Sequence, residues 1–335
     1  MTVPMIQTKN LKKYFATKKG ELHAVDGVNL TINSGETLGV VGESGCGKST
    51  LGRVILKLLE PTEGEVLFEG NDISKYNRKQ MKSMRKEMQI IFQDPFASLN
   101  PRMTVSEIIA EPIKVCKTIT NDNEILEKVF DLMNTVGLAE RFVNTYPHEL
   151  DGGRRQRIGV ARALALDPKF IVCDEPVSAL DVSIQAQILN LMMDLQDNMG
   201  LTYMFITHDL SVVKHISDNI AVMYLGQCVE LAKTDELFEN PAHPYTEALL
   251  EAIPIPSLKY RKKLNIIRGE VTSPINPKPG CRFAPRCPKV MPECSQASPE
   301  LTEISPGHFV SCYIYMNGHY QTKGEKHENI SANKS

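Results

Sequence analysis

One segment of the chain, Gly42-Glu43-Ser44-Gly45-Cys46-Gly47-Lys48-Ser49-Thr50, matches the pattern G-x-x-x-x-G-K-[ST]. It follows a short apolar run, residues 37–41, and opens a helical stretch that continues to Leu59. Glycines let the backbone wrap around a phosphate so that N–H groups point inward, and the start of a helix adds a favourable dipole. We expect Lys48 to reach the β and γ phosphates of a nucleotide and the Ser49 hydroxyl to ligate Mg²⁺. The expected nucleotide-binding residues here are Gly42, Ser44, Gly45, Cys46, Gly47, Lys48, Ser49 and Thr50.

A second apolar run, residues 170–173, ends in two carboxylates, Asp174 and Glu175. Asp174, at the end of a buried strand, would hold Mg²⁺, and Glu175 would polarise an attacking water. By itself such a run is weak evidence for an ATPase. Downstream of a phosphate-binding loop it is strong evidence, because phosphoryl transfer needs both a metal and an oriented nucleophile. Together the two segments predict an ATPase.

Short apolar runs of strand length alternate along the chain with segments of helical spacing, and this order indicates an α/β fold. Val28, Leu30 and Ile32 alternate as in a half-buried strand, and the spacing between residues 93 and 164 is helical. Strands separated by helices imply a parallel sheet with helices packed around it. We expect a nucleotide-binding domain over residues 1–236 with a helical subdomain at about 95–166. Runs of buried-strand length occur at residues 37–41, 88–92, 170–173 and 203–206.

The composition changes after about Leu237. Ten prolines between positions 241 and 292 make long regular elements unfavourable there. We expect a small loop-rich extension over residues 237–316. The polar segment 317–335 is expected to be a disordered tail.

The overall charge and hydropathy exclude some classes of protein. The formal charge of -2 gives no electrostatic reason to expect a nucleic-acid partner. The apolar runs are far shorter than the ~20 residues of a membrane-spanning helix. The polar N-terminus predicts no export. Any role at a membrane is therefore expected to come through a partner.

Four further segments, in order, resemble the motifs of ABC transporter ATP-binding subunits. The segment Leu150-Asp151-Gly152-Gly153-Arg154 resembles the signature motif, whose usual form is L-S-G-G-Q. Gln93 matches the Q-loop, Asp181 the D-loop and His208 the switch histidine. Phe15, with Tyr14 as the alternative, occupies the place where the family stacks an aromatic ring on adenine. The resemblance covers about residues 5–235.

The resemblance implies a mechanism and partners. Two such domains pair head to tail, and each ATP lies between one chain's phosphate loop and the other's signature helix. Glu175 and His208 would support hydrolysis, and Gln93 would sense the Mg²⁺ site and the membrane partner. The implied partners are a second ABC ATPase, two transmembrane permease subunits and, indirectly, an extracytoplasmic solute-binding protein. The implied location is peripheral, at the cytoplasmic face of the cell membrane.

The signature motif departs from the family at two positions, since Asp151 replaces serine and Arg154 replaces glutamine. In the family that serine bonds the γ-phosphate held by the opposite chain. A carboxylate would repel the phosphate by a few kcal/mol at ~4 Å and an effective dielectric constant of about 20. Arg154 offers a compensating charge, and Asp151 is also as good a helix N-cap as serine. We therefore expect a heterodimer with one working site and one slow site.

Two C-terminal segments, Asn240-Pro241-Ala242-His243-Pro244-Tyr245-Thr246 and Gly280–Pro288, resemble the extension of the oligopeptide and dipeptide permease ATPases. Four cysteines there have the spacing C-x5-C-x6-C-x17-C. Zinc sites use closer pairs, so the spacing and the resemblance favour a [4Fe-4S] cluster over zinc or free thiols. We expect a structural role for this site. The four residues are Cys281, Cys287, Cys294 and Cys312.

The leading functional hypothesis is the energising subunit of a peptide importer. Nickel or another small solute is the closest alternative cargo. A soluble ABC ATPase acting on ribosomes or DNA would have two nucleotide domains or a long coiled-coil insert, and this chain has neither. The intact Lys48, Asp174, Glu175 and His208 argue against a regulatory partner that binds ATP without hydrolysing it.

Overall fold

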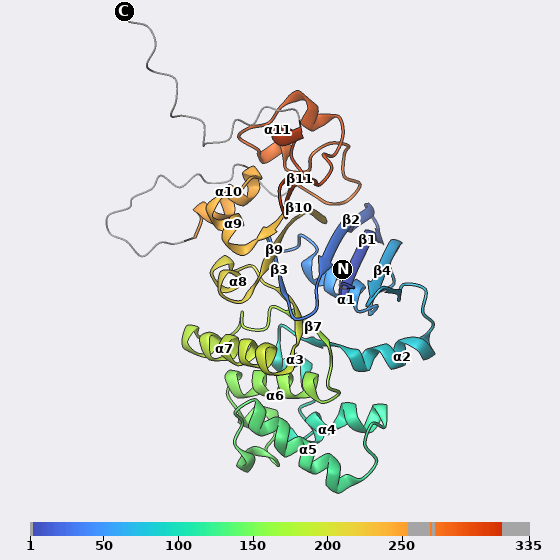
Figure 1. The fold of residues 1–335 in the computed structure, drawn as a ribbon, viewed down its shortest axis with the longest axis vertical. Helices are drawn as coiled ribbons and strands as arrows, with labels where there is room; N and C mark the ends of the chain where they lie inside the picture. Colours follow the sequence, from blue (N-terminus) through green and yellow to red (C-terminus); the bar gives the residue numbers. More distant parts are fainter. Residues whose placement is uncertain (1–2, 254–268, 270–271, 317–335) are drawn as a thin grey trace, which may run out of the picture.

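The computed structural model describes residues 3–253, 269 and 272–316, so the expected disordered tail lies outside the described residues. Figure 1 shows a central sheet with a second sheet beside it. A helical lobe lies at one end of the long axis and the C-terminal extension towards the other. Among the described helices, none is long and apolar enough to cross a bilayer.

Within the described residues the central sheet has eight strands, and it carries the phosphate loop, residues 42–50. Its neighbouring strands β9, β3, β8, β7 and β6 are all parallel. Strands β3, β7 and β8 are buried at every position, which explains their continuous apolar runs. The strand order is β11 (Thr302–Ser305), β12 (His308–Val310), β10 (Gln227–Lys233), β9 (Asn219–Tyr224), β3 (Thr37–Val41), β8 (Thr202–Ile206), β7 (Phe170–Asp174) and β6 (Met88–Ile91).

A second, antiparallel sheet packs over the helix that follows the phosphate loop. That helix, α1 (Lys48–Ile55), ends before the expected Leu59, where Lys57 takes a left-handed φ of 50°. The alternating Val28, Leu30 and Ile32 face a core shared with α1 and the central sheet. The strand order is β2 (Gly20–Ile32), β1 (Ile6–Thr17), β4 (Glu63–Phe68) and β5 (Asn71–Asp72).

The helical lobe shares a core with the central sheet. Ile125, Val129 and Leu132 are buried at helical spacing, in one apolar cluster with Cys173 of β7 and Phe205 of β8. The lobe's α-helices are α3 (Pro95–Ser98), α4 (Val105–Cys116), α5 (Asp122–Thr135) and α6 (Gly152–Leu164), with 3₁₀ turns at Glu140–Phe142 and Pro147–Glu149. The helices α2 (Arg78–Glu87), α7 (Val182–Met199) and α8 (Leu210–Ile216) lie between strands along the chain.

The C-terminal extension consists of short elements, in keeping with its prolines. They are α9 (Thr234–Glu239), α10 (Pro244–Glu251), 3₁₀ turns at Ala284–Arg286 and Pro292–Ser295, the hairpin β11–β12, and α11 (Tyr313–Met316).

The extension is joined to the central sheet and shares its core. Strand β12 pairs with β10, so the hairpin extends the central sheet. The fully buried Glu230 of β10 accepts hydrogen bonds from the backbone N–H groups of Ala242 and His243, and its Oε1 lies 2.8 Å from His308 Nε2. The prolines of this extension make long elements, and hence a large core of its own, unfavourable. Packing gives it a core by sharing that of the central sheet.

We predict that Phe283→Ala loosens the extension. The ring is 1% exposed and packs edge-on against Tyr224 and tilted against Tyr245, at centroid distances of 5.3 and 5.4 Å. Truncation should lower the free energy of unfolding by about 3–5 kcal/mol because it leaves a cavity. Urea unfolding and limited proteolysis would measure this. Val290→Ala, at a side chain 52% exposed, is the matched control. Equal stability of the two variants would contradict the prediction.

Candidate active site

The phosphate loop closes because two of its glycines lie against backbone. Gly42 has a φ of 148°, and an added Cβ would lie 2.1 Å from the carbonyl oxygen of Met223. Gly47, the N-cap of α1, has a φ of 105°, and its Cβ would lie 2.0 Å from the carbonyl oxygen of Ala24. No other residue type fits at these positions without moving the strands. The loop therefore presents backbone N–H groups and the start of α1 to one region.

Lys48 lies within this loop and is almost fully buried. Its Nζ donates to the carbonyl oxygens of Gly42 at 2.8 Å and Glu43 at 3.1 Å. The neighbouring Cys46 is buried, and burial raises the pKa of its thiol. The lysine is therefore the cation of the loop, and Cys46 contributes a neutral, packed side chain.

A hydroxyl and a carboxylate meet between α1 and β7. Ser49 Oγ donates to Asp174 Oδ1 at 2.6 Å, and Arg53 Nη2 lies 3.5 Å from Asp174 Oδ2. Small hard cations such as Mg²⁺ take oxygen ligands of this kind. Both side chains lie next to the phosphate loop, so their oxygen atoms are suited to holding a magnesium ion there.

Glu175 is held by two side chains that follow neighbouring parallel strands. Gln93, after β6, donates from Nε2 to Glu175 Oε2 at 2.8 Å. His208, after β8, places Nδ1 3.3 Å from Glu175 Oε1. Glu175 itself has a φ of 49°, which is unusual for a residue with a side chain and typical of functional sites. The three residues meet because carboxyl ends of parallel strands share one edge of the sheet.

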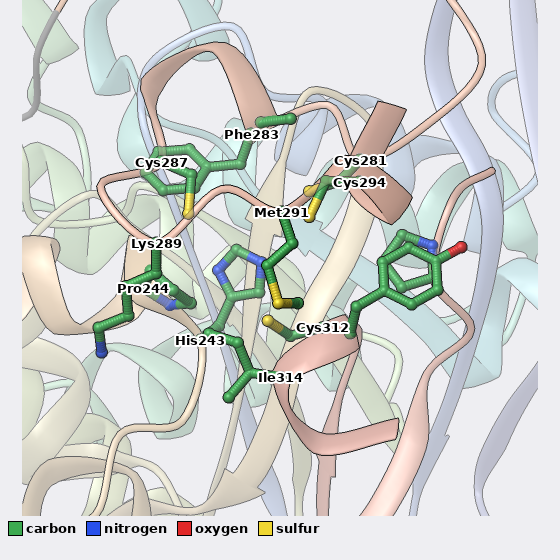
Figure 2. Close-up of a pocket in the computed structure, with 13 residues that line it drawn as sticks. His243, Pro244, Cys281, Phe283, Cys287, Lys289, Met291, Cys294, Cys312 and Ile314 are labelled. Carbon is green, nitrogen blue, oxygen red and sulfur yellow. The ribbon is translucent and has the colours of Figure 1, made fainter. Parts of the chain in front are cut away.

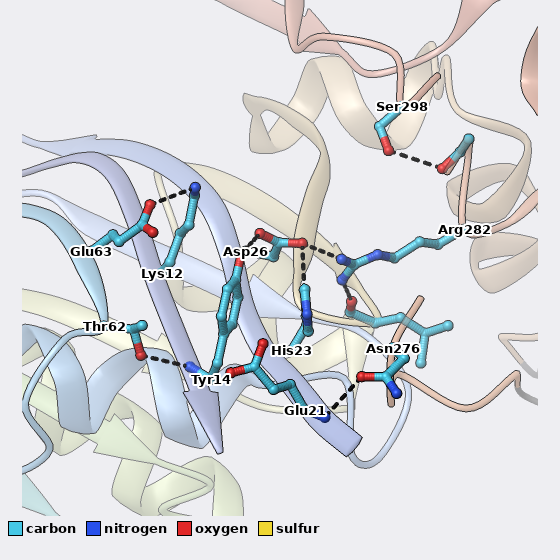
Figure 3. A network of polar contacts seen from close by, with 12 residues as sticks. Lys12, Tyr14, Glu21, His23, Asp26, Thr62, Glu63, Asn276, Arg282 and Ser298 are labelled. Atoms are coloured by element: carbon cyan, nitrogen blue, oxygen red, sulfur yellow. Dashed lines mark hydrogen bonds and ion pairs between the residues drawn. The ribbon is translucent and has the colours of Figure 1, made fainter. Parts of the chain in front are cut away.

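One cavity of about 450 Å³ joins these groups. Phe15 lines it, whereas Tyr14 does not: the Tyr14 hydroxyl donates to Asp26 and its ring stacks on His23 at 3.9 Å between centroids (Figure 3). Sequence reasoning missed four lining residues, Leu22, His23 and Ala24 of β2 and Pro274 of the extension, because no local motif marks them. The full lining is Phe15, Leu22, His23, Ala24, Ser44, Gly45, Gly47, Lys48, Ser49, Thr50, Gln93, Glu175, His208 and Pro274.

The signature segment lies apart from this cavity, at the start of α6. Asp151 Oδ1 accepts from the Arg154 backbone N–H at 2.8 Å, and Asp151 Oδ2 lies 2.5 Å from Arg154 Nη1. Gly152 and Gly153 form the first turn, and an added Cβ on Gly153 would lie 2.7 Å from Ile184 Cγ2. Asp181 is the N-cap residue of α7 and is exposed. Asp151 is thus both the helix cap and the ion-pair partner of Arg154.

The four C-terminal cysteines line a second cavity, together with His243 and Met291 (Figure 2). Its volume is about 10 Å³, room for about one water molecule. Within the described ranges, no group of three or more His, Cys, Asp or Glu side chains is arranged to hold a metal ion, so the expected metal site is not shown. Burial raises the pKa of the Cys281 and Cys287 thiols and raises that of Cys312 to about 12. All four cysteines line this one cavity, but they are not arranged as the ligands of a metal ion there.

Comparison with known proteins supports two family assignments. Residues 25–178 match the ABC transporter family, and residues 229–294 match the family described as "Oligopeptide/dipeptide transporter, C-terminal region". A dimeric ATP-binding cassette solved in a post-hydrolysis state with ADP and Pi superposes with a TM-score of 0.63 at 30% identity. That match covers 69% of this chain and 99% of the solved one.

Relatives also match over nearly the whole length. The putative oligopeptide transport ATP-binding protein YkfD of Bacillus subtilis is 51% identical over 96% of this chain and 98% of its own. The oligopeptide transport ATP-binding protein OppF of Escherichia coli is 52% identical over 85% of this chain and 88% of its own. The chain therefore belongs to the oligopeptide transport ATP-binding proteins of the ABC transporter family.

Proposed function

We propose that this chain hydrolyses ATP to energise an ABC importer of oligopeptides. The observation that carries the proposal is the single cavity in which Lys48, Ser49, Gln93, Glu175 and His208 meet. The full-length relatives named for oligopeptide transport favour peptides over nickel or another small solute as cargo. The match of residues 229–294 to the oligopeptide/dipeptide C-terminal region argues against a soluble ABC ATPase that acts outside transport.

Residues of the phosphate loop and β7 would bind MgATP. Ser49 and Asp174 would hold Mg²⁺, with Gln93 at the same edge of the sheet. When bound, Mg²⁺ neutralises charge that develops on the β and γ phosphates. Lys48 would exchange its bonds to loop carbonyls for the phosphates, and Phe15 would stack on the base. Asp174 would therefore position the metal, and Lys48 would position the phosphates.

Glu175 would orient the water that attacks the γ-phosphate. The water oxygen bonds to phosphorus while the bond to the β–γ bridging oxygen breaks, giving ADP and phosphate. Gln93 and His208 each contact one carboxylate oxygen of Glu175, so they fix the orientation of that carboxylate. These contacts would couple the water-orienting carboxylate to both neighbouring strands.

The active unit would be a pair of ABC ATPases beneath two transmembrane permease subunits. Asp151 and Arg154 lie outside the cavity of their own chain, so a second chain must supply the signature to this ATP. The solved cassette that superposes here is described as dimeric. The assembly would sit at the cytoplasmic face of the membrane and receive peptide from an extracytoplasmic binding protein.

The Asp151–Arg154 pair would make one of the two ATP sites slow. Both carboxylate oxygens of Asp151 are already engaged, one in capping α6 and the other with the Arg154 side chain. Asp151 also has no hydroxyl that could donate a hydrogen bond to a γ-phosphate. Loss of that hydrogen bond weakens the site by about 1.5–3 kcal/mol. Arg154 neutralises the Asp151 carboxylate. The missing hydrogen-bond donor, rather than charge repulsion, is therefore the main reason why this ATP site would be slow. The partner ATPase would carry an ordinary signature, and the pair would be a heterodimer.

The four cysteines would hold a [4Fe-4S] cluster, with zinc as the alternative. Supporting this, all four line one cavity, and four thiolates are the usual ligand set of such clusters. A cluster needs more room than the cavity offers, and Met291, a flexible side chain in the lining, could move to provide it. The group would tie together segments that are distant along the chain, a structural role.

Glu175→Gln is expected to abolish most hydrolysis while ATP binding persists. The amide keeps the contacts of the carboxylate but cannot accept the proton of the attacking water. The turnover of the assembled complex should fall by about 10²–10⁴-fold. Phosphate release and equilibrium ATP binding measure the two effects. Lys48→Ala, the contrasting variant, should lose ATP affinity. Near-normal turnover of Glu175→Gln would contradict the assignment of Glu175 as the residue that orients the attacking water.

The double change Asp151→Ser with Arg154→Gln should raise turnover at the slow site, provided that the partner's catalytic residues are intact. The serine restores a donor for the γ-phosphate and still caps α6. Single-turnover hydrolysis in the assembled heterodimer measures this. The single change Asp151→Asn keeps a cap without a hydroxyl and serves as the control. If the double variant matched the wild type, Asp151 would be a helix cap and nothing more.

Anaerobically purified protein is expected to be brown and to contain roughly four iron atoms per chain. Cys287→Ala should release the metal and expose the extension to proteases, while the phosphate-loop domain survives. Cys116→Ala, outside the cavity, is the matched control. One zinc per chain in a colourless preparation would establish the zinc alternative. Absence of both metals would refute the site.

A further inference from the structure

Two C-terminal segments converge on Glu43, a residue of the phosphate loop. Arg286, in the turn between Cys281 and Cys287, donates from Nη1 and Nη2 to Glu43 Oε2 and Oε1 at 2.8 and 3.1 Å. Such a bidentate, charge-assisted pair fixes geometry as well as charge. The arginine side chain is 7% exposed and the glutamate 25%, so the pair is largely shielded from water.

The backbone of Glu43 is held by the other segment. The Tyr245 hydroxyl, on α10, accepts from the Glu43 backbone N–H at 2.9 Å, and Tyr245 is fully buried. Its ring packs against Tyr224, whose hydroxyl lies 3.3 Å from Arg286 Nη1. The extension therefore fixes both the main chain and the side chain of Glu43.

The extension also reaches the base side of the cavity. Arg282 donates to the carboxylate of Asp26 and to the carbonyl oxygen of Leu225 (Figure 3). Asp26 contacts the ring of His23 at 3.2 Å, and the His23 backbone N–H donates to the Pro274 carbonyl at 3.1 Å. His23 and Pro274 both line the nucleotide cavity. The extension thus contacts the cavity wall on two sides.

The Arg286 contact has an electrostatic consequence for nucleotide binding. Glu43 is an acidic residue within a loop that receives the negatively charged phosphates, and its carbonyl oxygen lies 3.1 Å from Lys48 Nζ. Without a counter-charge the carboxylate would oppose the binding of the phosphates. Arg286 supplies that counter-charge from outside the nucleotide-binding body.

We propose that Arg286 is a positioning residue for ATP. Arg286 neutralises Glu43 and holds the phosphate loop in the conformation that binds the nucleotide. The proposal rests on the proposed ATPase function and deepens it. It makes the segment between Cys281 and Cys287 a part of the nucleotide site. If Arg286 only anchored the extension, the same contacts would be present. The effect of removing Arg286 on the affinity for MgATP would then not depend on the charge of Glu43.

A double-mutant cycle in the full-length chain separates these roles. The equilibrium Kd for MgATP would be measured for the wild type, Arg286→Met, Glu43→Gln and the double variant. Arg286→Met should raise Kd about tenfold. In the Glu43→Gln background the same change should raise Kd less than about twofold, because no carboxylate is left unpaired. Arg286→Lys, which keeps the charge, should recover part of the affinity. Lys289→Met removes an exposed cation of the extension that pairs with half-buried Glu247, and it is the control.

Three outcomes decide against the proposal. They are an unchanged Kd in folded Arg286→Met, an equal loss in both Glu43 backgrounds, and an equal effect of Lys289→Met. Thermal unfolding checks that each variant folds. If Arg286→Met does not fold, Arg286→Gln, which keeps hydrogen-bond donors and loses the charge, takes its place in the cycle, and an unchanged Kd there would overturn the proposal. A wild-type chain that fails to bind MgATP would instead refute the proposed function.

Discussion

The close approach of backbone to the phosphate loop is the constraint on which the rest of the site depends. At Gly42 and Gly47 the loop lies against carbonyl oxygens of β9 and β2, at distances that leave no room for a Cβ. The central sheet and the antiparallel sheet must therefore both be in place before the loop is closed. That closure sets where Lys48 and Ser49 point.

Parallel strand pairing then places the candidate catalytic side chains next to the phosphate loop. Because β6, β7 and β8 run in the same direction as β3, the residues that follow them share one edge. Gln93, Glu175 and His208 come from three different connections and meet in one set of hydrogen bonds. The left-handed backbone of Glu175 turns its carboxylate into that set. The proposed catalytic set therefore depends on the edge of the sheet rather than on any single segment.

The C-terminal extension belongs to the same arrangement. It adds a hairpin to the central sheet, shares the core around Tyr245 and Phe283, and places Arg286 on the phosphate loop. Buried Glu230 of β10 contacts two segments of it, one at Ala242 and His243 and the other at His308. A segment whose prolines prevent long elements is stabilised by packing on an existing core and by charged hydrogen bonds. Its stability and the geometry of the nucleotide site are therefore linked.

The sequence by itself determined the features that depend on contiguous residues. The phosphate loop, the carboxylate pair after β7 and the buried strands could be read locally, because glycine placement and apolar runs act over a few residues. Tertiary structure decided the rest. Phe15 rather than Tyr14 lines the cavity, His23 and Pro274 join it, and Arg286 pairs with Glu43 across 243 positions of sequence. No local pattern specifies such contacts, because they arise only when the sheets and the extension pack together.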